Sequence, residues 1–329
     1  MSSMEDYTAD TEDGYRLVLQ RVIGGEKGPV IMCHGLAGNS NEYLQRDERC
    51  SLARYLASNG YDAWVVDLRG HGLSKGFFIE ESGEWDFSQS ANGYWDFNVD
   101  DLIRYDTKAI IDKVKEVSGS DKVSWIGRSM GGWLGYAHVI DGYGKEDFKV
   151  VVSIASPSHF SEGFVRRMGD SRLVRRMMSA RSRGGISPNS ITSVMGSMGS
   201  SSKGLSLFSN ESRYVFLDFL DFLKRGEITK HNYGAEGNIE HYGSDISPSY
   251  WENFDKVDVP MVFITGTKDR FATPESTTES YNKVMEVHGE SSVHILPDFG
   301  HIDILVGDRA YVEVFPLVLE ALDSYDESK

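Results

Sequence analysis

Short apolar runs alternate along this chain with segments in which apolar residues recur at helical spacing. The apolar runs are Tyr15–Ile23, Val30–Cys33, Tyr61–Leu68, Lys122–Gly127, Lys149–Ala155, Pro260–Gly266 and Ser292–Pro297. Helical spacing is found over Arg49–Asn59, Val99–Val117, Met130–Ile140, Pro274–Val287 and Asp308–Tyr325. Strands that read as short apolar runs and alternate with helices are typical of a mostly parallel sheet covered by helices on both faces. The pattern therefore predicts an α/β fold.

One interval breaks this alternation. The stretch between Ala155 and Val259 is far longer than the roughly 2 to 6 residues that usually connect a strand and a helix in such a sheet. We therefore predict a core of residues 1–155 and 256–329, with an inserted, mainly helical cap subdomain at residues 156–255. Met168, Met177 and Met178 of this cap are candidates for a flexible apolar pocket wall, and packing inside the cap itself is the alternative.

Charge and composition narrow the classes of partner. A formal net charge of -16 disfavours binding to nucleic acid, because the phosphates would be repelled. The first ten residues resemble no secretion signal, and no stretch approaches the 18 apolar residues of a membrane span. Of the two cysteines, Cys33 lies within an apolar run, where a buried thiol is expected. These features favour a cytoplasmic protein without a transmembrane segment.

Two pentapeptides match Gly-x-Ser-x-Gly, the pattern that surrounds many nucleophilic serines. The pentapeptide "GRSMG" around Ser129 joins a predicted strand directly to a predicted helix, as a nucleophile on a sharp turn requires. "GLSKG" around Ser74 lies in a glycine-rich loop, and no helical pattern follows it. We therefore interpret Ser129 as the nucleophile and Ser74 as a hydroxyl that satisfies loop backbone groups.

A nucleophilic serine also needs a base and an acid that orients the base. Asp269 follows the strand "PMVFITG", and His301 follows the last predicted strand, so both lie where the strands of a parallel sheet end. The predicted triad is therefore Ser129, Asp269 and His301. Asp298 and Asp303 are rival candidates for the acid because they are close to His301 in sequence.

The developing oxyanion requires hydrogen-bond donors, and two backbone amides are the candidates. One is the amide of Met130, directly after the nucleophile, and the other is that of Leu36, in the loop after the strand "VIMC". His34 and Gly35 begin this loop and are candidates for substrate contact, with backbone positioning as the alternative for His34 and His71. No spacing of histidine and cysteine suggests a metal, and no cofactor is predicted.

Taken together, these motifs give the chain a resemblance to the α/β-hydrolase superfamily over nearly its full length. "HGLAGNS", "RGHGLSKG" and "GRSMGG" resemble segments of monoglyceride-lipase-like esterases. "YWDFNVDDLIRYDTKAIID" and "FGHIDILVG" resemble segments of acid lipases of the gastric and lysosomal type. One departure is Arg128, because both groups usually carry His before the nucleophile.

The resemblance implies that the family's triad falls on Ser129, Asp269 and His301, and its oxyanion amides on Leu36 and Met130. We expect a serine carboxylesterase, lipase-like, that acts on an ester with a hydrophobic acyl chain through an acyl-enzyme. Thioester or lactone cleavage, or acyl transfer, on the same triad are the alternatives. A binding protein without catalysis, in which the basic cap segment recognises an anion, is a further alternative.

Overall fold

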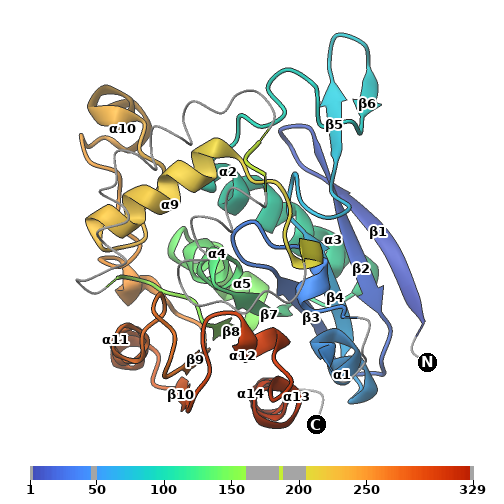
Figure 1. The fold of residues 1–329 in the computed structure, drawn as a ribbon, viewed down its shortest axis with the longest axis vertical. Coiled ribbons are helices and arrows are strands. Elements are labelled where there is room, and N and C mark those ends of the chain that lie inside the picture. The colour runs from blue at the N-terminus through green and yellow to red at the C-terminus, as the bar shows by residue number, and fades with distance from the viewer. Residues whose placement is uncertain (1–2, 46–49, 161–184, 188–204, 327–329) are drawn as a thin grey trace.

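A ten-stranded, mostly parallel sheet forms the centre of the protein (Figure 1). We describe a computed structural model over residues 3–45, 50–160, 185–187 and 205–326. The strand order is β10-β9-β8-β7-β3-β4-β2-β5-β6, and β1 pairs with β2. The six strands from β10 to β4 run parallel, whereas β1, β2, β5 and β6 pair antiparallel. The predicted fold class is confirmed.

The elements have the following bounds. The strands are β1 Met4–Asp10, β2 Tyr15–Val22, β3 Pro29–Cys33, β4 Asp62–Asp67, β5 Gly76–Ile79, β6 Glu84–Asp86, β7 Val123–Arg128, β8 Phe148–Ile154, β9 Met261–Gly266 and β10 Ser292–Leu296. The helices are α1 Leu52–Ser58, α2 Val99–Asp101, α3 Lys108–Ser118, α4 Met130–Ile140, α5 Gly144–Asp147, α9 Arg213–Arg225, α10 Gly234–Tyr242, α11 Pro274–Val287, α12 Asp303–Val306, α13 Ala310–Glu313 and α14 Phe315–Tyr325.

Two apolar layers cover the sheet because successive side chains of each strand point to opposite faces. In β3, Ile31 and Cys33 join the layer formed with α3, α4, α9 and α11. Val30 and Met32 join the opposite layer, formed with α1 and α14. These four strand residues have no exposed surface, so they are shielded from water on both faces of the sheet. This explains why the central strands read as uninterrupted apolar runs.

Two predicted helices are interrupted. In the segment Val99–Ser118, a π-helical stretch over Leu102–Thr107 separates α2 from α3, and the Thr107 hydroxyl donates to the Leu102 carbonyl. The predicted helix Asp308–Tyr325 divides into α13 and α14 at Val314, because Pro316 has no amide proton to continue the helix. Within the described residues, no helix is both long enough and apolar enough to cross a membrane.

The chain between β8 and β9 contributes α9 and α10, which lie on the side of the molecule away from α1 and α14 (Figure 1). A serine N-cap begins α9 and a left-handed glycine ends it, so its bounds follow from local sequence. Its buried residues Val215, Phe216 and Leu220 join the α4 layer of the core. The part of the insertion that carries α9 therefore packs against helices α2 and α4, which cover one face of the sheet, while the predicted division into core and cap stays a prediction.

Candidate active site

Ser129 lies on a strained turn between β7 and α4. Its φ of 51° and ψ of -116° are unusual for a residue other than glycine. The flanking glycines make the turn possible, because a Cβ atom on Gly131 would lie 2.1 Å from the Cys33 carbonyl oxygen and one on Gly127 would lie 2.1 Å from Gly131. The Ser156 hydroxyl also donates to the Ser129 carbonyl over 2.7 Å. Strand, turn and helix therefore hold the hydroxyl of Ser129 in one place.

The predicted base and acid meet this serine. His301 Nε2 lies 3.0 Å from Ser129 Oγ, and His301 Nδ1 lies 2.8 Å from Asp269 Oδ2. The other carboxylate oxygen of Asp269 accepts hydrogen bonds from the backbone amides of Phe271 and Ala272. The Asp269 carboxylate is fully buried, whereas His301 keeps a small exposed fraction. The structure thus aligns a hydroxyl, an imidazole and a carboxylate from three strand ends.

The rival residues have other partners. Asp298 is exposed and pairs with Lys268, and Asp303 accepts the amide of Gly300. Ser74 is buried, and among the described residues its hydroxyl bonds only to backbone: it donates to the Asp67 carbonyl and accepts from the Val18 amide. The structure therefore places Ser74 in the structural role that its loop context indicates.

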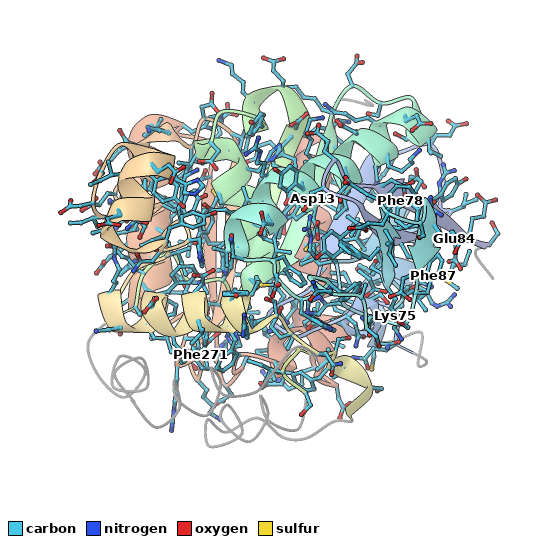
Figure 2. All side chains as sticks on the ribbon, turned by 90° about the horizontal axis from the view of Figure 1, so that it is seen from above. Asp13, Lys75, Phe78, Glu84, Phe87 and Phe271 are labelled. Carbon is cyan, nitrogen blue, oxygen red and sulfur yellow. The ribbon has the colours of Figure 1, made fainter. Side chains whose placement is uncertain are left out.

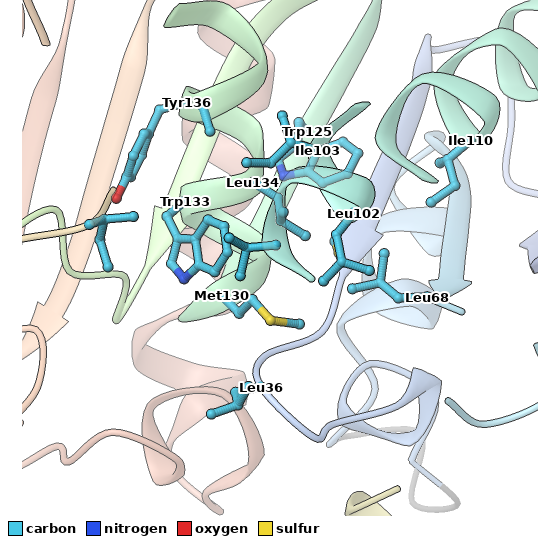
Figure 3. Packing of buried hydrophobic residues seen from close by; sticks show 14 of the residues in the cluster. Leu36, Leu68, Leu102, Ile103, Ile110, Trp125, Met130, Trp133, Leu134 and Tyr136 are labelled. Atoms are coloured by element: carbon cyan, nitrogen blue, oxygen red, sulfur yellow. The ribbon is translucent and has the colours of Figure 1, made fainter. Parts of the chain in front are cut away.

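The loop Gly35–Asn39 follows β3 and contains the Leu36 amide. Among the described residues, this amide has no hydrogen-bond acceptor. Met130 is the first residue of α4, so its amide is one of the first-turn amides that lack a partner within the helix. Figure 3 shows Leu36 and Met130 in the same region of the core. Two backbone donors are thus available near the elbow.

The side chain of His34 forms hydrogen bonds that join this loop to the end of β4. Its Nε2 accepts the Leu68 amide, so Nδ1 carries the proton and donates to the Gly35 carbonyl over 2.8 Å. Burial, and then the neighbouring His71, lower the pKa of His34 to about 3, which keeps the ring neutral. Both ring nitrogens are engaged by backbone, which matches the positioning alternative for His34 rather than substrate contact.

Arg128 forms a buried ion pair with Glu42. Its Nε lies 2.8 Å from Glu42 Oε2, and its Nη2 lies 2.5 Å from Glu42 Oε1. Burial alone would lower the pKa of Arg128, but the Glu42 carboxylate overrides this effect and raises it, so the arginine is charged. Arg128 departs from the family pattern in the sequence, but no sequence signal indicates its partner Glu42, which lies 86 residues away in the chain.

A second buried carboxylate reaches the loop from the segment between β8 and β9. Glu211 Oε2 accepts the Ala37 amide over 2.9 Å and lies 3.2 Å from His71 Nε2. Although burial opposes the charge of His71, the pKa of His71 is raised by Glu211. Ser209 donates its amide to the Ala37 carbonyl, so this segment holds both the amide and the carbonyl of Ala37. No sequence motif marks Glu211, because the contact joins distant parts of the chain.

Aromatic side chains continue from the histidine toward α9. The Phe271 ring lies 5.0 Å from the His301 ring, and Phe219 of α9 lies 6.1 Å from Phe271. Figure 2 shows Phe271 beside α9 and far from Phe78 and Glu84 of the β5–β6 hairpin. Phe160 and Phe216 are buried and pack next to the partly buried Phe219, so a series of aromatic rings extends from His301 to α9.

The other predicted features fall outside this arrangement. Met168, Met177 and Met178 lie outside the described residues, so their expected role as a pocket wall stays a prediction. Within the described residues, no cluster of three or more His, Cys, Asp or Glu side chains is arranged to hold a metal ion.

Comparison with known proteins identifies the family of this fold. The family model described as alpha/beta hydrolase fold matches residues 28–308, and one described as a partial alpha/beta-hydrolase lipase region matches residues 2–47. The chain therefore belongs to the α/β-hydrolase fold family, and the resemblance inferred from its motifs is confirmed.

The relatives are lipases and esterases. The chain is 23% identical to lipase lipl-1 of Caenorhabditis elegans, over 95% of this chain and 87% of that protein. It is 31% identical to human lysosomal acid lipase/cholesteryl ester hydrolase, over 40% of this chain and 33% of that protein. Among solved structures, a soluble variant of monoglyceride lipase from Saccharomyces cerevisiae gives a TM-score of 0.61 at 14% identity, and the match covers 100% of this chain and 96% of that one.

Proposed function

We propose that this protein is a serine carboxylesterase, lipase-like, which hydrolyses esters with a hydrophobic acyl chain. The observation that carries the proposal is the continuous hydrogen-bonded series from Ser129 Oγ through His301 to Asp269 on a strained strand-to-helix turn. Such a series activates a hydroxyl that is otherwise a weak nucleophile at neutral pH. Membership of the α/β-hydrolase family and the lipases and esterases among the relatives support the same reaction.

In the proposed reaction, Ser129 Oγ attacks the ester carbonyl carbon while its proton passes to His301 Nε2. The carbonyl electron pair moves to oxygen, where the Leu36 and Met130 amides stabilise the negative charge. Collapse of this intermediate expels the alcohol, which takes the proton from His301. Water then attacks the acyl-enzyme with His301 as base, and the acid is released. Asp269 holds the imidazole in the orientation and tautomer that both halves require.

The aromatic rings between His301 and α9 support the choice of a hydrophobic substrate. Phe219 is the partly buried ring of this series and offers a contact that an alkyl chain can share, and each buried methylene contributes about 0.8 kcal/mol to binding. In this proposal, the part of residues 156–255 that carries α9 supplies one wall of the substrate site.

The proposal is tested with a panel of p-nitrophenyl esters of increasing acyl length, followed by labelling with a fluorophosphonate. We expect hydrolysis of at least the short and medium esters, and a covalent phosphonyl adduct that mass spectrometry maps to Ser129. Matched thioesters and lactones, and assays with competing alcohols, identify the alternative reactions on the same triad. If the folded protein shows no turnover and no labelling, the proposal is refuted and a binding protein is supported instead.

Substitution of Phe219 tests the proposed acyl contact. We expect Phe219→Ala to raise KM for an octanoate ester by about 3- to 10-fold, because the chain loses part of its apolar surface. The acetate ester is the internal control, since its chain is too short to gain much from an extended apolar surface. Equal changes in KM for both esters would contradict the assignment of Phe219 to the acyl site.

A further inference from the structure

Three consecutive backbone amides of the loop after β3 differ in their hydrogen-bond acceptors. The Gly35 amide donates to Glu42 Oε2 over 3.4 Å, and the Ala37 amide donates to Glu211 Oε2 over 2.9 Å. The Leu36 amide between them has no acceptor among the described residues. Buried carboxylates thus engage the neighbours of the proposed oxyanion donor and leave that donor available.

The carboxylate of Glu42 also connects this loop to the elbow. Arg128 immediately precedes Ser129, and its guanidinium binds both oxygens of Glu42. The loop wraps closely around the pair, because a Cβ atom on Gly35 would lie 2.5 Å from Arg128 Nη2 and one on Gly38 would lie 2.3 Å from Glu42 Oε1. The two segments that carry the oxyanion amides therefore share one bidentate ion pair.

Burial makes this connection rigid. The side chains of Arg128 and Glu42 are 6% and 3% exposed, so neither charge can be satisfied by water if the other moves away. A bidentate arginine–carboxylate contact also fixes direction as well as distance. The pair thus opposes any shift of the loop relative to the elbow.

Glu211 fixes the other end of the loop. Its side chain has no exposed surface, and its Oε1 accepts the Ser212 amide while Oε2 binds Ala37 and His71. Ala37 has a φ of 52°, a conformation that a non-glycine residue keeps when its surroundings hold it there. The carboxylate on its amide and Ser209 on its carbonyl provide such support.

We infer that Arg128, Glu42 and Glu211 are positioning residues that hold the Leu36 amide in register with the Met130 amide. The inference rests on the proposed function, because it assigns these three side chains to the oxyanion hole of the same reaction. Among the described residues, none of their side-chain hydrogen bonds reaches Ser129 Oγ, His301 or Asp269. Their effect is expected on the stabilisation of the tetrahedral oxyanion, not on binding of the ester.

Two substitutions in the ion pair test the inference. Glu42→Gln keeps the size and one acceptor but removes the charge, and Arg128→Lys keeps the charge but loses the bidentate fork. Loss of one oxyanion donor costs about 100- to 1,000-fold in kcat. We expect displacement of a donor to cost about 10- to 100-fold in kcat, with KM changed less than about threefold. The loss should be smaller for Arg128→Lys, which rescues part of the pair.

A trifluoromethyl ketone with an alkyl chain gives the second readout. Ser129 adds to its carbonyl and forms a tetrahedral oxyanion, whereas the corresponding alkyl alcohol binds without one. The Ki of the ketone should rise in proportion to the loss of kcat, and the Ki of the alcohol should stay constant. Glu211→Gln is expected to lower kcat and raise the Ki of the ketone in the same way, although it leaves the contacts of Glu42 with Gly35 and Arg128 in place.

Arg21→Gln is the matched control, because Arg21 makes a similar bidentate pair with Asp62 between β2 and β4, away from the loop. We expect it to keep wild-type kcat and ketone Ki.

The inference is overturned if folded Glu42→Gln and Arg128→Lys keep kcat and ketone Ki within twofold of wild type, or if Arg21→Gln matches their losses. If Glu42→Gln does not fold, kcat and ketone Ki of Arg128→Lys and Glu211→Gln decide the test by the same criteria. A wild-type enzyme without esterase activity or labelling refutes the proposed function itself, which is a separate outcome.

Discussion

Replacement of Ser129 by alanine is expected to lower kcat for the preferred ester by about 10,000- to 1,000,000-fold. The reason is that Ser129 Oγ, 3.0 Å from His301 Nε2, is the protein atom that bonds to the acyl carbon in the proposed mechanism. The fold should be retained, because alanine removes one oxygen from the elbow and leaves its glycines unchanged. Initial rates and fluorophosphonate labelling, measured on the same preparation, give the loss.

Ser74→Ala is the matched control, since Ser74 has the same motif around it. Its hydroxyl connects the end of β4 to β2, so the change should lower the free energy of unfolding by about 1 to 3 kcal/mol and leave kcat near wild type. The assignment is wrong if Ser129→Ala keeps wild-type turnover, or if Ser74→Ala abolishes turnover while the protein stays folded.

The two serines could be distinguished from sequence because the chemistry depends on local context. A strand followed at once by a helix is visible as a change of periodicity, and "GRSMG" lies at that change whereas "GLSKG" does not. Asp269 and His301 were predictable for a related reason. Each follows a strand of the same parallel sheet, and the carboxyl ends of parallel strands lie along one edge.

The central strands were predictable because burial on both faces leaves few polar residues in them. The strands β1, β5 and β6 were not predicted. β1 is mostly exposed and carries Glu5, Asp6 and Asp10, and β5 and β6 form a short hairpin with partly exposed residues at the edge of the sheet. An edge strand buries at most one face, so its apolar signal is weak and is easily read as a loop.

The supports of the oxyanion loop could not be predicted, and the reason is distance along the chain. The contacts of Glu42 with Arg128 and of Glu211 with Ala37 join residues that are 86 and 174 positions apart, so they exist only in the folded chain. An acidic residue in a loop reads as a solvated charge by default, and nothing local distinguishes these two. The available signal was the departure at Arg128, because a buried arginine requires a carboxylate partner.

Asp269→Asn is expected to lower kcat by about 10,000-fold with little change in the fold. The asparagine oxygen can still accept the amides of Phe271 and Ala272, so the loop keeps its hydrogen bonds. Its NH₂ group would then face His301 Nδ1 and donate where the carboxylate accepts. The imidazole is thereby forced to carry its proton on Nε2, where it can no longer take the proton of Ser129. The pH-independent maximum of kcat on the preferred ester measures this loss.

Asp298→Asn provides the control, because Asp298 is closer to His301 in sequence than Asp269 is but pairs with Lys268 at the surface. An exposed pair of this kind contributes at most about 1 kcal/mol, so kcat and stability should both remain near wild type. The acid would have to be reassigned if Asp298→Asn lost activity while folded Asp269→Asn retained it. A moderate and equal loss in both variants would instead mean that the loop around His301 acts as a unit, and that the 2.8 Å contact of Asp269 with Nδ1 does not set the tautomer.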